Sequence, residues 1–318
     1  MAAVLGSNSR LNGSVAAVLL RRIGQAAVVL LLVSMVAFAL VLLTGDPVAM
    51  MMPIHASEAD RRELEQQLGL NRPYVVQYLD FLAGVMRGEL GDSIKFNQPV
   101  GQLILSKLPA TLLLTGTAMT LAIGIGLPLG ILAGSRPNSI FDVLATGASL
   151  LAISLPTFWI GLILILLLAD RWRLLPVGGS GTPLHVIMPA LALSAHSLGL
   201  LTRLTRASVA EEFQRPYVTT ARSKGLSERW IGARHVLRNA MIPTITVIGL
   251  QFGSLLGGSV IVEAVFSWPG IGWLLMQGVY ARDVPLVRAL VLLIGAGFIV
   301  VNLLVDLSYR LIDPRIRA

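Results

Sequence analysis

The residues that could carry out chemistry are few in this sequence, and they are not grouped in the patterns that catalysis requires. The chain has no Cys, and its four His residues are scattered without the spacing of metal ligands. It contains no nucleophile elbow, no H-E-x-x-H motif and no acidic metal cluster. The phosphate-binding pattern G-x-x-x-x-G-K-[ST] is also missing. The sequence therefore predicts a protein that is not an enzyme and binds no cofactor or metal itself.

A basic segment, residues 203–242, carries eight of the 25 Lys and Arg residues. Residues 217–224 predict a short helix that ends at Gly225, because glycine is common just beyond a helix C-terminus. Ser227 is a suitable N-cap for a second helix. The apolar stripe predicted on that second helix consists of Trp230, Ala233 and Leu237. Two short helices at a glycine bend predict a compact cytoplasmic knob, with an ordinary basic loop as the alternative.

Glu263 is the only acidic residue near the fifth long apolar run. A charge inside a membrane span is costly, so it is expected to face protein or water. One hypothesis places Glu263 on a translocation path, where it could contact the amino terminus of a peptide. The alternative is a carboxylate near the outer membrane interface that is paired with a residue such as Arg282 or is exposed to water.

Glycine recurs every fourth residue in two of the apolar runs. One set is Gly126, Gly130 and Gly134, and the other is Gly249, Gly253 and Gly257. Small residues at this spacing form a flat stripe that another helix can approach closely. For the second set, a flat wall on a translocation path and close helix packing are both open.

The elements that position these residues are membrane spans. The chain of 318 residues is 55% hydrophobic and only 13% charged, which fits a polytopic membrane protein rather than a soluble one. An apolar helix of about 20 residues crosses one bilayer. The sequence predicts an all-α fold with about six spans, at residues 23–43, 111–133, 143–169, 184–202, 243–265 and 289–305. The third span contains Pro156 and is long enough to tilt or kink.

The distribution of positive charge predicts the orientation of these spans. Segments assigned to the cytoplasmic side hold 15 Lys and Arg residues, and those assigned to the outside hold 10, of which six lie in residues 44–110. Because a loop of that length has little weight in the positive-inside rule, both termini are expected to be cytoplasmic. The same rule explains the net charge of +8 better than a nucleic-acid partner does.

Residues 44–110 form the longest polar segment and predict a helical cap outside the membrane. Residues 57–68 are rich in strong helix formers, with Ser57 as a candidate N-cap. A second, amphipathic helix is predicted for residues 74–86. The first apolar run could instead be a signal peptide, since Ala37 and Ala39 fit an A-x-A cleavage pattern. The run is longer than a signal requires, however, and an uncleaved span is the better interpretation.

Several motifs together resemble one known family of membrane proteins. The string from Thr219 to Trp230, T-T-A-R-S-K-G-L-S-E-R-W, is similar to the EAA loop of ABC importer permeases, although Thr219 stands where the general family has Glu. The segments G-D-P from Gly45, G-L-N-R-P from Gly69 and G-G-S-V-I-V-E-A-V-F-S-W-P-G from Gly257 resemble the dipeptide/oligopeptide branch of that family. The resemblance extends in order over nearly the whole chain.

This resemblance implies a permease subunit in the bacterial cytoplasmic (inner) membrane. The chain would pair with a second homologous permease subunit, sit on two ATPase subunits that bind ATP and Mg, and receive solute from an extracytoplasmic substrate-binding protein. The expected ATPase-coupling residues are Thr219, Thr220, Ala221, Lys224, Gly225, Leu226, Ser227 and Trp230. The expected translocation-path residues are Gly249, Gly253, Gly257 and Glu263. The solute could be a dipeptide, an oligopeptide, a glutathione-like molecule or a metal chelate.

Two other functions remain as alternatives. A secondary transporter driven by an ion gradient would have ionisable or broken-helix sites in two corresponding halves. The sequence shows one intramembrane Glu and no clear inverted repeat. A membrane enzyme is disfavoured because the catalytic motifs are missing.

Overall fold

The computed structural model describes residues 21–22, 24–39, 57–67 and 71–312. The parts of the first span and of the outer cap that were predicted on residues 40–56 lie outside this range. The chain divides into two compact units, which are considered separately. The smaller unit comprises residues 1–104 and 277–303, and the larger comprises residues 105–276 and 304–318.

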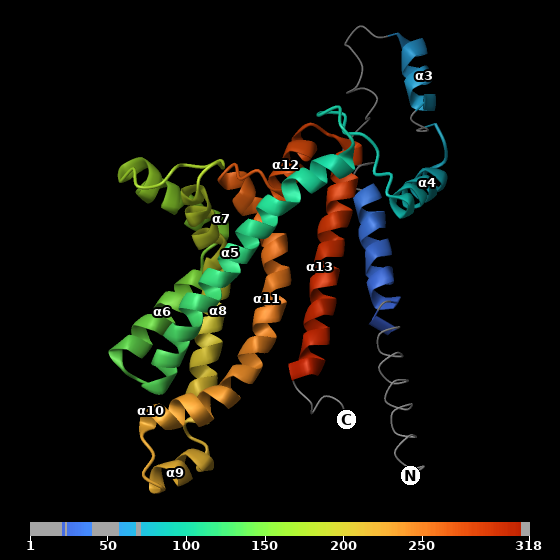
Figure 1. The fold of residues 1–318 in the computed structure, drawn as a ribbon. Helices are drawn as coiled ribbons and strands as arrows, with labels where there is room; N and C mark the ends of the chain where they lie inside the picture. The colour runs from blue at the N-terminus through green and yellow to red at the C-terminus, as the bar shows by residue number, and fades with distance from the viewer. Residues whose placement is uncertain (1–20, 23, 40–56, 68–70, 313–318) are drawn as a thin grey trace, which may run out of the picture. The chain divides into compact units, whose positions relative to one another are not determined.

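The larger unit is a helical bundle in which α8 packs against α6, α7 and α11 (Figure 1). Its elements in chain order are α5 (Val100–Ser135), α6 (Ile140–Ser154), α7 (Thr157–Leu164), the π-helix Ile165–Arg171, the 3-10 helix Pro183–Val186, α8 (Ile187–Glu212), α9 (Pro216–Ser223), α10 (Glu228–Ile231), the π-helix Gly232–Val236, α11 (Leu237–Val265) and α12 (Ile271–Tyr280). The first five residues of α5 and the last four of α12 belong to the smaller unit. Leu114, Met188, Leu193, Leu255 and Phe266 lie in the buried core of the larger unit.

The prediction of an all-α membrane protein is confirmed, since the described residues contain many long apolar helices. Among the described residues, four helical segments are long and apolar enough to cross a bilayer, and there would be a fifth if one bent helix pair formed a single span. They are Val100–Ser135, Pro183–Glu212, Glu228–Val265 and Val284–Val305, with the bent pair at Ile140–Ser154 and Thr157–Arg171. The helix Gly24–Ala39 is apolar but shorter. The total of six spans and the cytoplasmic position of both termini stay predictions.

The third predicted span is not one tilted helix. It is broken between α6 and α7, and the helical segments Ile140–Ser154 and Thr157–Arg171 are bent by 106° relative to each other. Leu155 is extended, with φ −84° and ψ 134°, and Pro156 precedes the first residue of α7. Because a proline disfavours the helical conformation of the residue before it, a helix tends to stop there. The sequence left a tilt or a kink open for this span, and the structure shows a complete break at Leu155 and Pro156.

Three helices extend well beyond the apolar runs that predicted them. Helix α5 begins at Val100 rather than near residue 111, and α8 continues to Glu212 rather than ending near residue 202. Residues 228–265 form one continuous helical segment, although the fifth span was expected to begin near residue 243. Hydropathy marks the part of a helix that lies in lipid, and polar turns can extend the same helix into water.

The first glycine stripe does allow two helices to approach closely, as its spacing predicts. A Cβ atom on Gly130 would lie 2.6 Å from Cβ of Thr205 and 2.7 Å from the carbonyl oxygen of Thr202. A Cβ atom on Gly134 would lie 2.6 Å from the carbonyl oxygen of Arg206. Both glycines therefore face the backbone of α8, and a larger side chain would force α5 and α8 apart.

We expect Gly130→Ala to destabilise the protein by about 1–3 kcal/mol, the usual cost of overpacking a tight contact. The matched control is Gly124→Ala in the same helix, because a Cβ atom there meets nothing within 4 Å. That control should be neutral or stabilising, since alanine favours the helical state over glycine by about 1 kcal/mol. Thermal unfolding of the two purified variants in detergent compares them directly, and equal midpoints would contradict the close α5–α8 packing.

The smaller unit contains the two helices predicted for the cap segment, and both predictions are confirmed. They are α3 (Glu58–Gln67) and α4 (Tyr74–Arg87). Ser57 caps α3 as expected, since its Oγ accepts a hydrogen bond from the Asp60 amide at 3.2 Å. The Tyr78 hydroxyl of α4 lies 2.7 Å from Ser34 Oγ on the helix Gly24–Ala39. Helix α13 (Val284–Ile312), of which residues 284–303 belong to this unit, is capped by the buried Asp283 carboxylate.

Candidate functional site

The knob predicted around Gly225 is present at one end of the bundle, between α8 and α11 (Figure 1). Helix α9 spans Pro216–Ser223, and Gly225 follows it in the left-handed conformation with φ +79°. The amide of Leu226 donates to the carbonyl of Ala221 at 3.3 Å, which closes the helix end. The prediction that Gly225 terminates this helix is therefore confirmed.

Ser227 occupies the predicted N-cap position of α10, with φ −68° and ψ 147°. The predicted N-cap position is therefore correct. The expected hydrogen bond from a backbone amide to the Ser227 side chain is not formed. Helix α10 is only four residues long and continues through the π-helix into α11. The second helix of the knob is thus the beginning of a long helix and not a separate element.

A small apolar core holds the knob together. Its buried residues come from α8, α9 and the start of the 228–265 helical segment: Val209, Val218, Ala221, Ile231, Val236 and Ala240. Of the predicted apolar stripe, Leu237 is half-buried and packs against this core, whereas Trp230 and Ala233 are exposed, and Ile231 and Val236 are the fully buried residues. A wider helical turn at the π-helix shifts the buried face, so the regular 3.6-residue period does not apply there.

Polar contacts reinforce the same fold. The guanidinium of Arg222 on α9 donates to both carboxylate oxygens of Glu228 on α10, at 2.5 and 3.1 Å. The Tyr217 hydroxyl donates to Glu212 at 2.6 Å. Burial, followed by the contact with the Glu212 carboxylate, raises the pKa of Tyr217. These contacts connect α9 to the end of α8 and to α10, so the knob is held at several points.

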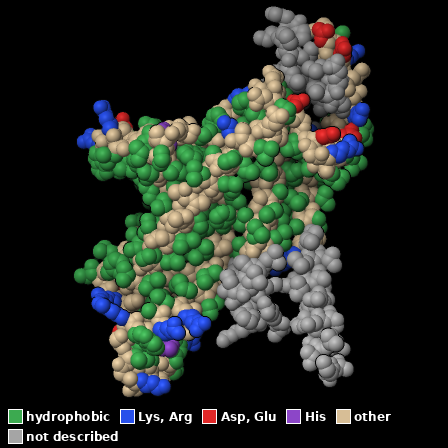
Figure 2. Space-filling view, viewed as in Figure 1, with side chains coloured by type: hydrophobic (Ala, Val, Ile, Leu, Met, Phe, Trp, Pro, Cys, Tyr) green, Lys and Arg blue, Asp and Glu red, His purple; other side chains and the backbone are tan. Residues whose placement is uncertain are grey.

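The structure places the predicted coupling residues on the surface of the knob, with one exception. Thr219, Thr220, Lys224, Gly225, Leu226, Ser227 and Trp230 are exposed, whereas Ala221 is buried in the knob core. Leu226 and Trp230 are notable because they expose large apolar side chains. Figure 2 shows Lys and Arg side chains gathered at the end of the molecule that carries α9 and α10. This surface is basic and exposes the apolar side chains of Leu226 and Trp230, a combination that suits contact with another protein.

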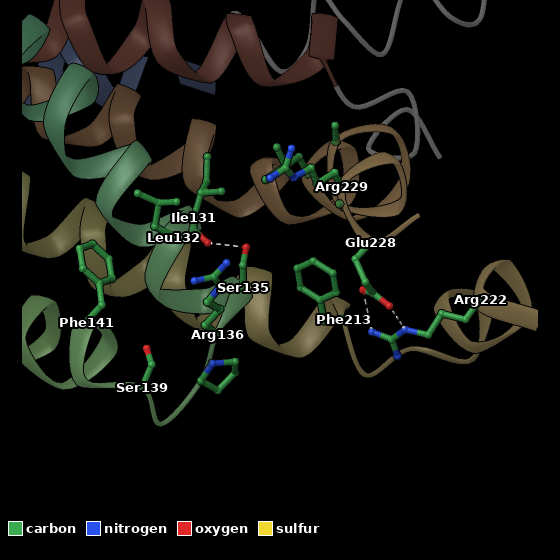
Figure 3. A pocket seen from close by; sticks show the side chains of 14 residues that line it. Ile131, Leu132, Ser135, Arg136, Ser139, Phe141, Phe213, Arg222, Glu228 and Arg229 are labelled. Atoms are coloured by element: carbon green, nitrogen blue, oxygen red, sulfur yellow. Dashed lines mark hydrogen bonds and ion pairs between the residues drawn. The ribbon is translucent and has the colours of Figure 1, made fainter. Parts of the chain in front are cut away.

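A cavity of about 940 Å³ lies beside the knob (Figure 3). Its walls come from the end of α5, the start of α6, the end of α8 and the two helices of the knob. The residues with charged side chains along it are Arg136, Arg222, Glu228 and Arg229. Most of the other lining side chains are apolar.

An ion pair that no sequence motif indicates connects α6 to α8. Arg206 Nε donates to Asp142 Oδ1 at 2.9 Å, and Arg206 Nη2 donates to Asp142 Oδ2 at 2.7 Å. Asp142 is almost completely buried and also accepts a hydrogen bond from the amide of Asn138 at 2.9 Å. A lone acidic residue at the start of an apolar run could have signalled this pair, because such charges usually find a partner. The partner, Arg206, lies beyond the apolar run that predicts this span, in the polar continuation of α8 to Glu212.

Glu263 is also fully buried, in the last turn of α11. Its carboxylate accepts hydrogen bonds from Thr111 Oγ1 at 2.7 Å and from the amides of Gly272 and Trp273 at 2.7 and 3.1 Å. The two amides belong to the first turn of α12, where N–H groups have no partner within the helix. A side chain on Gly270 would overlap both the Glu263 carboxylate and Thr111 Oγ1.

The buried carboxylate of Glu263 contradicts the predicted exposure to water, whereas its place on a translocation path stays a prediction. The carboxylate is not exposed to water, and its contacts in the larger unit are with α5 and α12. The three glycines of the second stripe, Gly249, Gly253 and Gly257, have different surroundings. A Cβ atom on Gly249 would lie 2.6 Å from Cγ1 of Val305, Gly253 is buried, and Gly257 has open space around it. Gly249 thus serves close packing, while Gly257 is free to face a path.

Comparisons with known proteins agree with this architecture. Residues 126–318 match the family model of the binding-protein-dependent transport system inner membrane component, and residues 15–115 match the N-terminal model of the same kind of membrane component. The dipeptide transport system permease protein DppB of Escherichia coli (strain K12) is 39% identical, over 94% of this chain and 98% of that protein. The oligopeptide transport system permease protein AppB of Bacillus subtilis (strain 168) is 37% identical, over 95% of this chain and 99% of that protein.

A third relative and two solved structures extend the comparison. The glutathione transport system permease protein GsiC of Escherichia coli O6:H1 is 41% identical, over 91% of this chain and 94% of that protein. The fold resembles the MetNI methionine ABC transporter in inward-facing conformations, with a TM-score of 0.52, 18% identity, and coverage of 67% of this chain and 97% of that chain. It also resembles an amino acid ABC transporter crystallised with histidines, with a TM-score of 0.54, 19% identity, and coverage of 66% and 94%. Together with the apolar helices, these matches identify a multi-pass protein of the inner membrane. The chain belongs to the binding-protein-dependent transport system inner membrane components, in the branch of the dipeptide and oligopeptide ABC importer permeases.

Proposed function

We propose that this chain forms half of the translocation pathway of an ATP-driven importer for dipeptides, oligopeptides or a related small solute. A substrate-binding protein outside the membrane would deliver the solute, and a second homologous permease would complete the pathway. Two partner ATPase subunits would bind and hydrolyse ATP with Mg. The peptide names of relatives that match over nearly the full chain support this substrate class.

The observation that carries this proposal is the knob around Gly225. It has its own buried core and an ion pair between its two helices, and it exposes Leu226 and Trp230. Because its second helix continues into the helical segment ending at Val265, a force applied to α9 and α10 would reach a span without an intervening loop. We assign the ATPase contact to the exposed residues of this knob, namely Thr219, Thr220, Lys224, Gly225, Leu226, Ser227 and Trp230. Ala221 supports them from the core.

The orientation belongs to the same proposal. Residues 203–242 would lie on the cytoplasmic side, where the ATPases are, and the cap segment within residues 44–110 would lie outside. Gly257 would line the path, because it is the member of its stripe with open space. Binding protein and ATP must favour different conformations, since a ligand with equal affinity for both states shifts no equilibrium.

Uptake into vesicles tests the proposal. The complete complex is reconstituted from this chain, its neighbouring permease and the ATPases, and uptake of a labelled dipeptide is measured with and without ATP and binding protein. We expect uptake that requires both and that persists when an uncoupler collapses the ion gradient. Uptake that stops with the uncoupler while ATP is maintained would instead identify a gradient-driven carrier.

A further inference from the structure

The cavity beside the knob has the chemistry of a site for an amphipathic anion. Its charged lining residues are three Arg and one Glu, which leaves a net charge of +2. Glu228 is already neutralised by its two-point contact with Arg222. Arg136 and Arg229 form no ion pair within the described part of the chain. Figure 3 shows Arg136 and Arg229 on different elements around the same cavity.

A second positive feature comes from the backbone of α6. Ser139, the N-cap of this 15-residue helix, and Phe141 in its first turn both line the cavity. The N-terminus of a helix carries a partial positive charge and favours negatively charged groups. Asp142 in the same turn does not cancel this effect for a ligand, because its carboxylate is bonded to Arg206.

The remaining walls are apolar and lead onto apolar surface. Ile131, Leu132, Phe213 and Leu237 line the cavity together with Phe141. Beyond it, Ile140, Val143 and Leu144 at the start of α6 are exposed. In Figure 2 hydrophobic side chains cover the sides of α5 and α6 next to this basic end. In an inner-membrane protein such a surface faces lipid chains, so a ligand held by the arginines would have its apolar part directed along these helices.

We propose that this cavity binds the headgroup of an anionic phospholipid, with the acyl chains lying on the exposed face of α5 and α6. Basic pockets at the ends of membrane helices select anionic headgroups by charge, and Arg contacts phosphate oxygens through two parallel hydrogen bonds. A soluble anion would satisfy the arginines but would leave the apolar walls in water. The lipid would then contact both the α5–α6 hairpin and the knob. This inference concerns lipid binding and does not depend on the proposed coupling to ATPases.

Lipid binding to the full chain in nanodiscs tests the proposal. The discs contain phosphatidylcholine with or without phosphatidylglycerol, and retained lipid is measured by native mass spectrometry. We expect wild type to prefer phosphatidylglycerol, and Arg136→Ala/Arg229→Ala to lower its apparent affinity about thirtyfold. Each basic residue near an anionic headgroup contributes about fivefold. Both arginines are exposed, so their replacement should not unfold the chain.

The matched control is Arg234→Ala/Arg238→Ala, which removes the same charge from exposed positions nearby that do not line the cavity. This variant should retain the wild-type preference. An equal loss in both double variants, or none in the first, would overturn the proposal. Displacement of the lipid by glycerol 3-phosphate, which has the phosphate without acyl chains, would show a small-anion site instead. Loss of the bound lipid when the ATPase subunits are added would show that the cavity is a protein interface.

Discussion

Glu263→Ala is expected to destabilise the protein by about 3–5 kcal/mol. The substitution removes the acceptor for three donors, Thr111 Oγ1 and the amides of Gly272 and Trp273. A buried donor left without a partner costs about 1–3 kcal/mol. The two amides have no other partner within α12, and both Glu263 and Gly272 are buried. The variant should therefore unfold at a much lower temperature than wild type in the same detergent.

The control for this prediction is Glu211→Ala. Glu211, like Glu263, is a hydrogen-bonded carboxylate. Its partner is Arg215, and both of these side chains are more than half exposed. An exposed pair at this helical spacing contributes about 0.3–0.5 kcal/mol. Thermal unfolding, followed by tryptophan fluorescence, should therefore separate the two variants clearly. If Glu263→Ala unfolded at the wild-type temperature, the carboxylate would not hold α12 against α5, and its place on a solute path would deserve a direct transport test.

Asp142→Ala is the second substitution with a large expected effect, about 2–4 kcal/mol. Removal of one partner from a buried ion pair costs about 3–5 kcal/mol, and a third of the Arg206 side chain is exposed, which lowers the cost through solvent screening. Both guanidinium contacts to α6 are lost, together with the bond from the Asn138 amide. We expect α6 to separate from α8 more easily, which limited proteolysis of the α5–α6 loop would detect.

An exposed ion pair provides the comparison for Asp142. Arg72 Nη1 lies 3.0 Å from Asp80 Oδ2, and the two side chains are 58% and 61% exposed. Asp80→Ala should change stability by less than about 1 kcal/mol. Arg206→Lys tests the two-point geometry, because lysine keeps the charge but cannot donate through a planar fork. If this variant matched wild type in proteolysis, charge alone would account for the contact.

The elements that local chemistry controls were predictable from the sequence. Gly225 ends α9 because glycine adopts the left-handed conformation without strain, and Ser57 caps α3 by a contact three residues away. The stripe of Gly126, Gly130 and Gly134 predicted a close helix approach, which α8 provides. In each case the signal lies within one turn of a helix or on one face of it.

The features that depend on distant segments were not predictable in the same way. The partner of Asp142 is 64 residues away, and Thr111 is 152 residues from Glu263. No local pattern specifies such pairs. The π-helix at Gly232–Val236 also shifts the buried face of the knob to Ile231 and Val236, which the regular helical period of the sequence did not indicate. Helix ends were misplaced wherever polar turns continued an apolar helix, as at the end of α8.

Force transfer through the knob is tested by comparing peptide uptake of Gly225→Val and Gly225→Asn in the reconstituted complex. Gly225 has φ +79°, which a β-branched residue adopts only with strain and asparagine tolerates. No atom lies within 4 Å of the added Cβ, so both variants should assemble with the ATPases. If the knob transmits force, Gly225→Val loses most ATP-dependent peptide uptake while Gly225→Asn keeps it. Equal, wild-type uptake by both assembled variants would show that the knob does not transmit force.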